Sequence, residues 1–199
     1  MKTKILAFVS AIIFLSSCGN SKPTLPSVTG TQFEVLVVMP DSSWRKPSGR
    51  SVVALLNQDM NDLPQSEPVM DLHHCTPVQF DDVLKPSRNI VLAEVSPKFS
   101  TAKIIYGKDK WATPQAIVKI TAPDDSSFTA AVKANGDKIV DYFVSSERER
   151  LMAFNKDNVN DKAQAEVERM FGVKIDIPMG ISKITEKKDF FWITNDQPN

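Results

Sequence analysis

At residues 33–39 the chain reads Phe33-Glu34-Val35-Leu36-Val37-Val38-Met39. This run is apolar and rich in β-branched side chains, and a proline follows it, so it predicts a buried strand that ends at Met39. Similar runs at 89–95 and 116–121 predict two more strands, and we expect the segment around 103–106 to form a hairpin with the second of them. An alternating run at 173–178 and an apolar run at 190–194 predict the last strands.

Between these strands, apolar residues recur at helical spacing. Residues 51–60 predict one helix, and the Pro-rich stretch 64–77 after it predicts a loop. A long helical region is expected to begin at 123–127, with an interruption at Asn135-Gly136 and a second start at the possible capping box of Ser146 and Glu149. A further helix is expected to end at Phe171, with Gly172 as its C-cap. One side of the long region is apolar and consists of Phe128, Val132, Ile139 and Phe143.

The predicted order of elements is β-α-β-β-α-α-β-β, and one face of each helix is apolar. This order predicts an α+β fold in which helices pack on one face of a mainly antiparallel sheet, with a ferredoxin-like split β-α-β arrangement as the leading topology. Residues 31–199 are expected to form a single domain.

The composition excludes several classes of protein. The 199 residues contain 24 Lys and Arg and 24 Asp and Glu, and 42% are apolar, which argues against a disordered chain and against a nucleic-acid binder. Two cysteines are too few for a disulfide framework or an iron–sulfur protein. The sequence lacks the spacings of a phosphate-binding glycine loop, a nucleophile elbow and the HExxH zinc motif, so we expect no cofactor and no metal.

The N-terminus has the pattern of a secretion signal. Lys2 and Lys4 precede an apolar run over residues 5–15, which is too short to span a bilayer. It leads into Leu15-Ser16-Ser17-Cys18-Gly19, which resembles the bacterial lipobox. The resemblance implies that residues 1–17 are a lipoprotein signal peptide and that Cys18 is the site of lipid attachment.

The lipid on Cys18 would hold the protein on a membrane. Residues 18–30 are small, polar and proline-containing, so they predict a lipid-anchored flexible tether. Since no Asp follows Cys18, the common inner-membrane retention signal is missing, and the expected location is the outer membrane, facing the periplasm.

His73-His74-Cys75 is the one cluster of soft metal ligands in the sequence. With Asp71, Asp81 or Asp82 it offers ligands for zinc, but the sequence contains no second His or Cys pair, so we favour a structural segment with no metal. A nucleophilic Cys75 would need a base and an orienting group, and sequence neighbours rarely supply that geometry. We therefore expect Cys75 to be buried and inert.

Charged and aromatic residues give two further candidates. The run Glu147-Arg148-Glu149-Arg150 offers Arg148 and Arg150 to an anionic ligand or a partner, but a solvated helix face is the favoured interpretation. The three tryptophans are candidates for a glycan-binding face, although packing is the commoner role. Trp44 and Trp111 have polar neighbours and are the better surface candidates, whereas Trp192 lies in a run typical of core.

Several short motifs together resemble a known family. They are Leu25–Gly30, Glu34–Met39, Trp44, Arg88–Ile90, Trp111–Gln115, Ala122–Asp124, Glu147–Arg150, and Phe171–Val173 with Ile177-Pro178. The chain resembles an uncharacterised lipoprotein family of Bacteroidetes-type bacteria, number 4837 in the domain-of-unknown-function series. The resemblance implies no activity and no catalytic residue. Members of that family continue beyond the position of Trp192, which leaves open whether a C-terminal half is absent here.

These patterns predict a cell-envelope lipoprotein that serves as a binding or scaffolding module. Its expected partners are the membrane, through Cys18, and an envelope protein or glycan, with no nucleic acid. The alternative is an envelope hydrolase or other enzyme that uses acidic residues the sequence does not identify.

Overall fold

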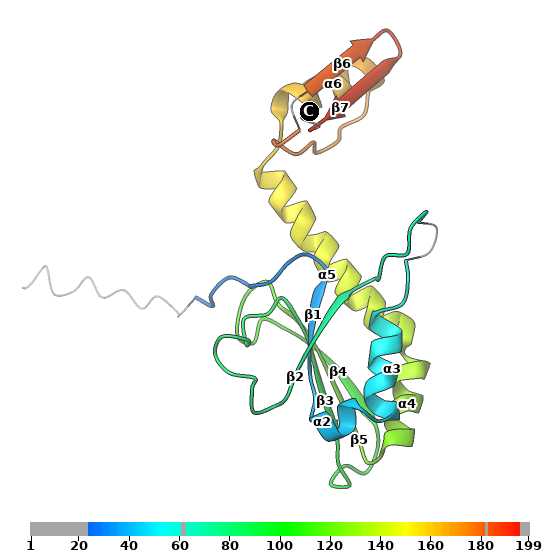
Figure 1. The fold of residues 1–199 in the computed structure, drawn as a ribbon. Helices are drawn as coiled ribbons and strands as arrows, with labels where there is room; N and C mark the ends of the chain where they lie inside the picture. The colour runs from blue at the N-terminus through cyan, green and yellow to red at the C-terminus, as the bar shows by residue number, and fades with distance from the viewer. Residues whose placement is uncertain (1–23, 61–62, 182, 196–199) are drawn as a thin grey trace, which may run out of the picture.

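The computed structural model describes residues 24–60, 63–181 and 183–195. Its centre is a five-stranded sheet with the strand order β2-β1-β3-β5-β4 (Figure 1). In chain order the strands are β1 (Glu34–Val38), β2 (Asp71–Cys75), β3 (Asn89–Val95), β4 (Lys103–Lys108) and β5 (Ala116–Ala122). The predicted strands at 33–39, 89–95 and 116–121 and the hairpin strand near 103–106 are therefore confirmed.

The pairing within this sheet is mainly parallel. β1 runs parallel to β2 and to β3, and β3 runs parallel to β5, whereas β4 is antiparallel to β5. The α+β class is confirmed, but the mainly antiparallel sheet and the ferredoxin-like arrangement are wrong. The reason is that the chain passes from β1 to β2 through a helix, and a crossover of this kind returns the chain in the same direction.

β2 lies within the stretch 64–77 that was expected to be a loop. It pairs with β1 in register from Glu34↔Asp71 to Val38↔Cys75 and forms one edge of the sheet. An edge strand has a single neighbouring strand and is less buried than a central one, so its sequence lacks the apolar run that marks β1. The prolines at both ends of the stretch added to the expectation of a loop.

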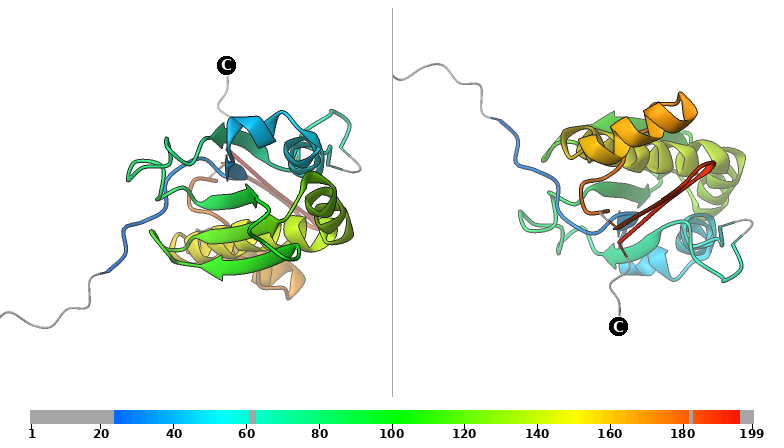
Figure 2. Two further views of the ribbon diagram at one scale, coloured as in Figure 1. Left: turned by 90° about the horizontal axis from the view of Figure 1, so that it is seen from below. Right: turned by 90° about the horizontal axis from the view of Figure 1, so that it is seen from above.

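Helices cover one face of the sheet (Figure 2). They are α2 (Asp41–Trp44), α3 (Pro47–Leu56), α4 (Asp125–Ala134) and the first half of α5 (Gly136–Asp157). The main core lies between this layer and the sheet, and in it Phe128, Val132, Ile139 and Phe143 pack as their spacing predicted. α3 begins four residues earlier than expected because Pro47 occupies its first turn, where proline is well tolerated.

Of the two predictions for the region around the junction of α4 and α5, one is confirmed and one is wrong. The expected interruption at Asn135-Gly136 is confirmed, and a Cβ built on Gly136 would lie 2.9 Å from Leu55 Cδ1, which explains the glycine. The expected helix start at Ser146 is wrong. α5 continues through this residue, whose hydroxyl donates to the carbonyl of Tyr142 at 2.8 Å.

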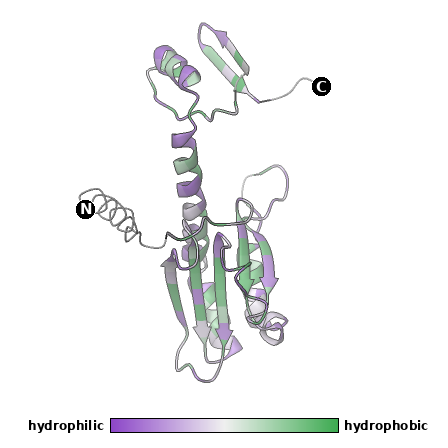
Figure 3. Ribbon diagram, turned by 90° about the vertical axis from the view of Figure 1, so that its left-hand side faces the viewer, coloured by the Kyte–Doolittle hydropathy of each residue, from purple (hydrophilic) through white to green (hydrophobic). Residues whose placement is uncertain are grey.

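The other face of the sheet, called here the open face, has no helix packed on it among the described residues. Loops 76–88 and 109–115 lie over part of it, and Figure 3 views the molecule with the strands in front of the helices. A second, smaller core forms beneath these loops. Its buried members are Leu36, Val38, Cys75, Ile90 and Ile117, and Phe80, Leu84, Leu92 and Trp111 pack against them.

α5 extends past the sheet and leads to a small C-terminal unit (Figure 1). This unit consists of α6 (Asp161–Phe171) and the antiparallel pair β6 (Lys183–Lys187) and β7 (Phe190–Thr194). Gly172 ends α6 in the left-handed conformation with φ 67°, which confirms the predicted C-cap. The strand predicted at 173–178 is wrong, because the one β-bridge of this segment to another described residue is the isolated pair Val159↔Pro178. The single domain over 31–199 stays a prediction.

Within the described residues, the structure contains no helix that is both long and apolar enough to cross a membrane.

Candidate functional site

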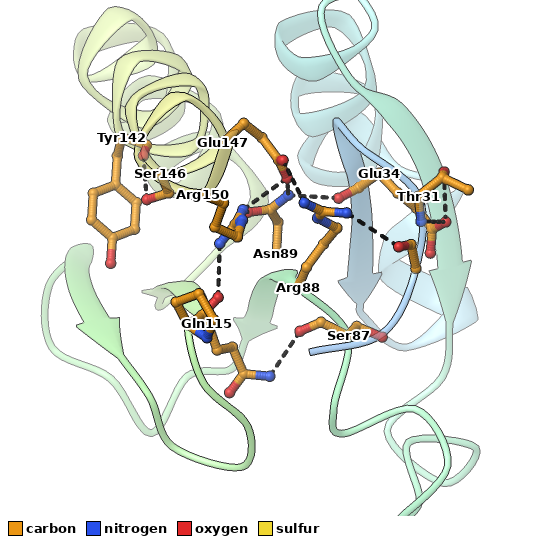
Figure 4. Close-up of polar contacts among 12 residues, drawn as sticks. Thr31, Glu34, Ser87, Arg88, Asn89, Gln115, Tyr142, Ser146, Glu147 and Arg150 are labelled. Atoms are coloured by element: carbon orange, nitrogen blue, oxygen red, sulfur yellow. Dashed lines mark hydrogen bonds and ion pairs between the residues drawn. The ribbon is translucent and has the colours of Figure 1, made fainter. Parts of the chain in front are cut away.

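The amino ends of β1, β3 and β5 share one edge of the sheet, where a charged cluster is buried (Figure 4). At its centre is Glu147 of α5, whose side chain is 2% exposed. The Glu147 carboxylate accepts hydrogen bonds from Arg88 Nη2 at 2.8 Å, Asn89 Nδ2 at 2.6 Å and Arg150 Nη2 at 2.7 Å. We call these four residues the amino-edge cluster. Since Asn89 is the first residue of β3, the cluster joins α5 to the sheet.

The amino-edge cluster also holds the backbone of neighbouring segments. Asn89 Nδ2 donates to the carbonyl of Glu34 at 2.7 Å, and Arg150 Nη1 donates to that of Pro114 at 2.9 Å. The Nε atoms of both arginines are buried without a hydrogen-bond partner among the described residues. Nearly every other polar atom of the cluster is hydrogen-bonded within the cluster or to the backbone. The amino-edge cluster therefore has a structural role, which is to fix α5 to the sheet.

The expectation of a solvated face for Glu147–Arg150 is wrong for the two outer residues. The side chains of Glu147 and Arg150 are 2% and 8% exposed, whereas Arg148 and Glu149 are exposed as predicted. The helical repeat places positions 147 and 150 on the side of α5 that faces the sheet. Their partners in the Arg88-Asn89 pair lie far away in the sequence, so the charge run alone gave no sign of burial.

Part of the predicted tether follows the same edge. The described residues 24–30 are hydrogen-bonded to the body, with Thr113 N donating to Pro26 O at 2.8 Å and Thr29 N donating to Pro86 O at 2.9 Å. Arg88 adds a side-chain bond to the carbonyl of Gly30 at 3.2 Å. The chain is therefore held to the body from Pro26 onward. Cys18 and the predicted signal peptide lie outside the described residues.

The two histidines of the predicted ligand cluster point to different environments. The His74 ring stacks on Trp44, with centroids 4.1 Å apart, and its Nε2 lies 2.9 Å from the carbonyl oxygen of Met39. His73 alternates to the other face of β2 and lies 3.5 Å from the carboxylate of Asp71 on the surface. In the part of the chain that the structure describes, no three His, Cys, Asp or Glu side chains are grouped to hold a metal ion.

Cys75 is buried in the smaller core, as expected, with 6% of its surface exposed. Burial and, to a lesser degree, the charge of Asp81 raise the pKa of its thiol. A protonated thiol is a poor nucleophile, so this environment agrees with an inert cysteine. Asp82, the other candidate ligand nearby, pairs instead with Lys85 at 2.7 Å, and this contact lowers its pKa.

At the carboxyl edge of the sheet, the strand order changes direction. β1 is followed in the chain by β2 on one side and then by β3 on its other side. In parallel sheets, crevices at the carboxyl ends of two such strands are the usual ligand sites. A cavity of about 420 Å³ lies here on the open face, lined by Val38 at the end of β1, by Pro40 after it, and by Leu92 and Glu94 of β3. We call it the switch-point pocket.

The covering loops supply the aromatic wall of the switch-point pocket. Phe80 comes from loop 76–88 and Trp111 from loop 109–115, and their rings meet edge to face with centroids 5.2 Å apart. Lys110 Nζ lies 4.4 Å from the centre of the Trp111 ring, a favourable cation–π distance. An apolar floor with a few charged groups at the rim is typical of small-molecule sites, and the volume falls in their range.

Three charged side chains lie at the rim of the switch-point pocket. Glu94 pairs with Lys98 four residues later, so its charge is balanced within the protein. Lys119 projects from the middle of β5 and has no ion-pair partner among the described residues. With Lys110, it leaves the pocket rim positively charged.

The tryptophans are placed differently from one another. Trp111 lines the switch-point pocket, while Trp44 is half-buried against His74. The expectation that Trp192 belongs to the core is wrong, because its side chain lies on the outer face of β7 and is 54% exposed. The alternate residues Phe191 and Ile193 pack toward α6 instead.

Sequence reasoning singled out Trp111 but missed the rest of the pocket. Lys119 had a signal, since it is the one charged residue in the otherwise apolar stretch Ala116–Ala122. Phe80 had none, because its loop reaches the open face only through the parallel crossover from β2 to β3.

Comparison with known proteins finds a family but no characterised relative. No curated protein and no solved structure matches the chain. A family model described as "Domain of unknown function (DUF8532)" matches residues 28–156, which include the whole five-stranded sheet, the amino-edge cluster and the switch-point pocket. The predicted membership in an uncharacterised family of unknown function is thus confirmed. The family number differs, because the matching model is 8532 whereas the sequence resemblance pointed to 4837. Because this model covers well over half of the sequence, the chain belongs to the DUF8532 family.

Proposed function

We propose that the protein is a cell-envelope lipoprotein, anchored through a lipid on Cys18, whose body is a binding module for an envelope ligand. The anchoring rests on the charged start, the apolar run and the motif Leu15-Ser16-Ser17-Cys18. An origin in Bacteroidetes-type bacteria and a position on the outer membrane, facing the periplasm, are part of the same proposal.

The observation that carries the binding role is the switch-point pocket. It combines the location expected for a ligand site with an aromatic wall and lysines at the rim. An envelope hydrolase that works through paired carboxylates would need two acidic groups close together in one cavity. Of the described residues that line this pocket, Glu94 is the one carboxylate, and it pairs with Lys98. The pocket therefore favours binding over acid–base catalysis.

The path of the tether supports this arrangement. Residues 26–30 are held at the amino edge of the sheet, where Pro26 accepts a hydrogen bond from Thr113 of loop 109–115, whereas the strand residues of the switch-point pocket lie at the end of β1 and in the second half of β3. A body anchored through its N-terminus would present its amino edge to the membrane and keep the pocket accessible from the aqueous side.

The anchoring can be tested with the full chain expressed in a Gram-negative host. Metabolic labelling with a palmitate analogue should label the wild type, and the protein should fractionate with outer membranes. Cys18→Ala should abolish both the label and the membrane association.

Cys75→Ala is the matched control, because it removes the other cysteine of the chain. It should retain the label. A wild type that is cleaved and released without label, or a Cys18→Ala variant that stays labelled, would contradict lipid attachment at Cys18.

A further inference from the structure

A second cavity adjoins the switch-point pocket on the open face. It has a volume of about 340 Å³, is lined by Phe99, Lys103 and Ile105 among others, and shares Lys119 with the first cavity. The pairing of β4 with β5 sets Ile105 opposite Lys119 and Lys103 opposite Thr121, so the two cavities lie over one continuous sheet surface. We call these two neighbouring cavities together the basic groove.

The charge of the basic groove differs from that of the whole chain. The chain balances 24 basic against 24 acidic residues. The groove is lined by four lysines and a single carboxylate, Glu94, among the described residues, and Glu94 pairs with one of those lysines. A hollow lined by one sign of charge concentrates ligands of the opposite sign. The four lysines are Lys98, Lys103, Lys110 and Lys119.

Each end of the basic groove also contains an aromatic ring beside an ammonium group. Lys110 Nζ lies 4.4 Å from the Trp111 ring centre at one end, and Lys98 Nζ lies 5.0 Å from the Phe99 ring centre at the other. Sugar rings present apolar C–H faces that pack against aromatic side chains, and aromatic residues with a polar surrounding suit such mixed ligands. A sugar that also carries a carboxylate would pair with the adjacent lysine.

From the two neighbouring cavities, the four lysines and the aromatic ring at each end, we propose that the basic groove binds an acidic oligosaccharide, a short chain of sugars that carry carboxylates. This inference rests on the proposed binding function and names its ligand class. Lys119, shared by both cavities, is the central contact for the acidic groups.

A nucleic acid is the other polyanion that combines flat groups with negative charge. Lysine pairs with phosphates as well as with carboxylates, so the lysines among the described residues that line the groove suit either group. The neutral charge of the chain, however, differs from the basic excess of nucleic-acid binders. The acidic sugar is therefore the better fit, and an oligonucleotide serves as a competitor in the test.

The test is calorimetric titration of the full chain, purified in a mild detergent, with an oligogalacturonide of four to six sugars. Its fully methyl-esterified form is the matched ligand, because it has the same sugar rings without the negative charges. The acid should bind at least about 10-fold more tightly than the ester, and salt should weaken its binding. Lys119→Gln should weaken it by about 3- to 10-fold, whereas Lys138→Gln, on the exposed side of α5, should leave it unchanged.

The proposal is overturned if acid and ester bind equally, if neither binds, if Lys119→Gln and Lys138→Gln behave alike, or if a single-stranded oligonucleotide of similar length binds as tightly as the acid. These results are independent of the lipid-labelling result at Cys18. Failed sugar binding in a labelled protein contradicts the groove alone, and sugar binding by an unlabelled protein contradicts the anchoring alone.

Discussion

The amino-edge cluster and the basic groove use similar charged residues in opposite ways. In the cluster, Glu147 is buried, both arginine side chains are largely buried, and nearly all of their polar atoms are bonded within the protein. In the groove, the lysines are exposed and Lys119 has no ion-pair partner in the described part of the chain. Buried, paired charges stabilise a fold because removing one leaves its partners unsatisfied, whereas exposed charges contribute little to folding and remain free to meet a ligand.

The largest loss of stability should come from removing the carboxylate at the centre of the amino-edge cluster. Glu147→Ala leaves two buried guanidinium groups without their carboxylate and should lower the free energy of unfolding by about 3–5 kcal/mol. Urea denaturation measures this change. Glu149 lies two residues further along α5 and is exposed, so Glu149→Ala should leave the midpoint of urea denaturation nearly unchanged. Equal stability of the two variants would show that the cluster does not hold α5 to the sheet.

A smaller effect is expected at the wall of the groove. Trp111 is half-buried and packs on the smaller core, so Trp111→Ala should cost about 2 kcal/mol of unfolding free energy and weaken the binding of the acidic oligosaccharide. Thermal unfolding and calorimetry measure the two effects. Trp192→Ala removes an exposed indole from β7 and should change neither value appreciably. If Trp192→Ala alone weakened binding, the ligand site would lie elsewhere.

A third prediction concerns pH at the core beneath the groove. The thiol pKa of Cys75 is raised from 9.0 in the folded protein, mainly by burial. The stabilising contribution of the protonated thiol is therefore complete below the unfolded pKa and is lost as pH rises through the folded pKa. Between pH 8 and 10, the wild type should lose more stability than Cys75→Ala.

Thiol labelling gives an independent measure of the same environment. At pH 8, Ellman's reagent should react slowly with native Cys75 and rapidly after unfolding in guanidinium. Fast labelling of the native protein, or a parallel pH profile for the wild type and Cys75→Ala, would contradict the buried position of this thiol.

The smallest loss of stability should follow a substitution of Lys119 at the centre of the basic groove. Lys119→Gln should change the free energy of unfolding by less than about 0.5 kcal/mol, because the side chain is exposed and has no ion-pair partner within residues 24–60, 63–181 and 183–195. Urea denaturation of this variant beside Glu147→Ala compares the two regions directly. A large loss of stability would mean that Lys119 has a structural role like that of the cluster.

The central strands could be predicted because they are buried on both faces and read as continuous apolar runs, as in β1 and β5. The polar edge strand β2 could not be predicted in this way. Without β2, neither the parallel crossover nor the change in strand order beside β1 could be predicted. In the same way, Trp111 was recognisable as a candidate by its polar neighbours, but its partnership with Phe80 and Lys119 depends on contacts between distant segments. The burial of Glu147 likewise depends on Arg88 and Asn89.

If Cys18 carries the proposed lipid, the hydrogen bonds that hold residues 26–30 to the amino edge limit how far the body can lie from the membrane. With a lipid on Cys18, only the eight residue steps to Pro26 separate the bilayer from the body, and a fully extended chain of that length reaches at most about 29 Å. Such a short tether would keep the body close to the membrane and raise its effective concentration for a ligand on the same membrane. A ligand attached farther than this from the membrane would then be out of reach of the anchored protein.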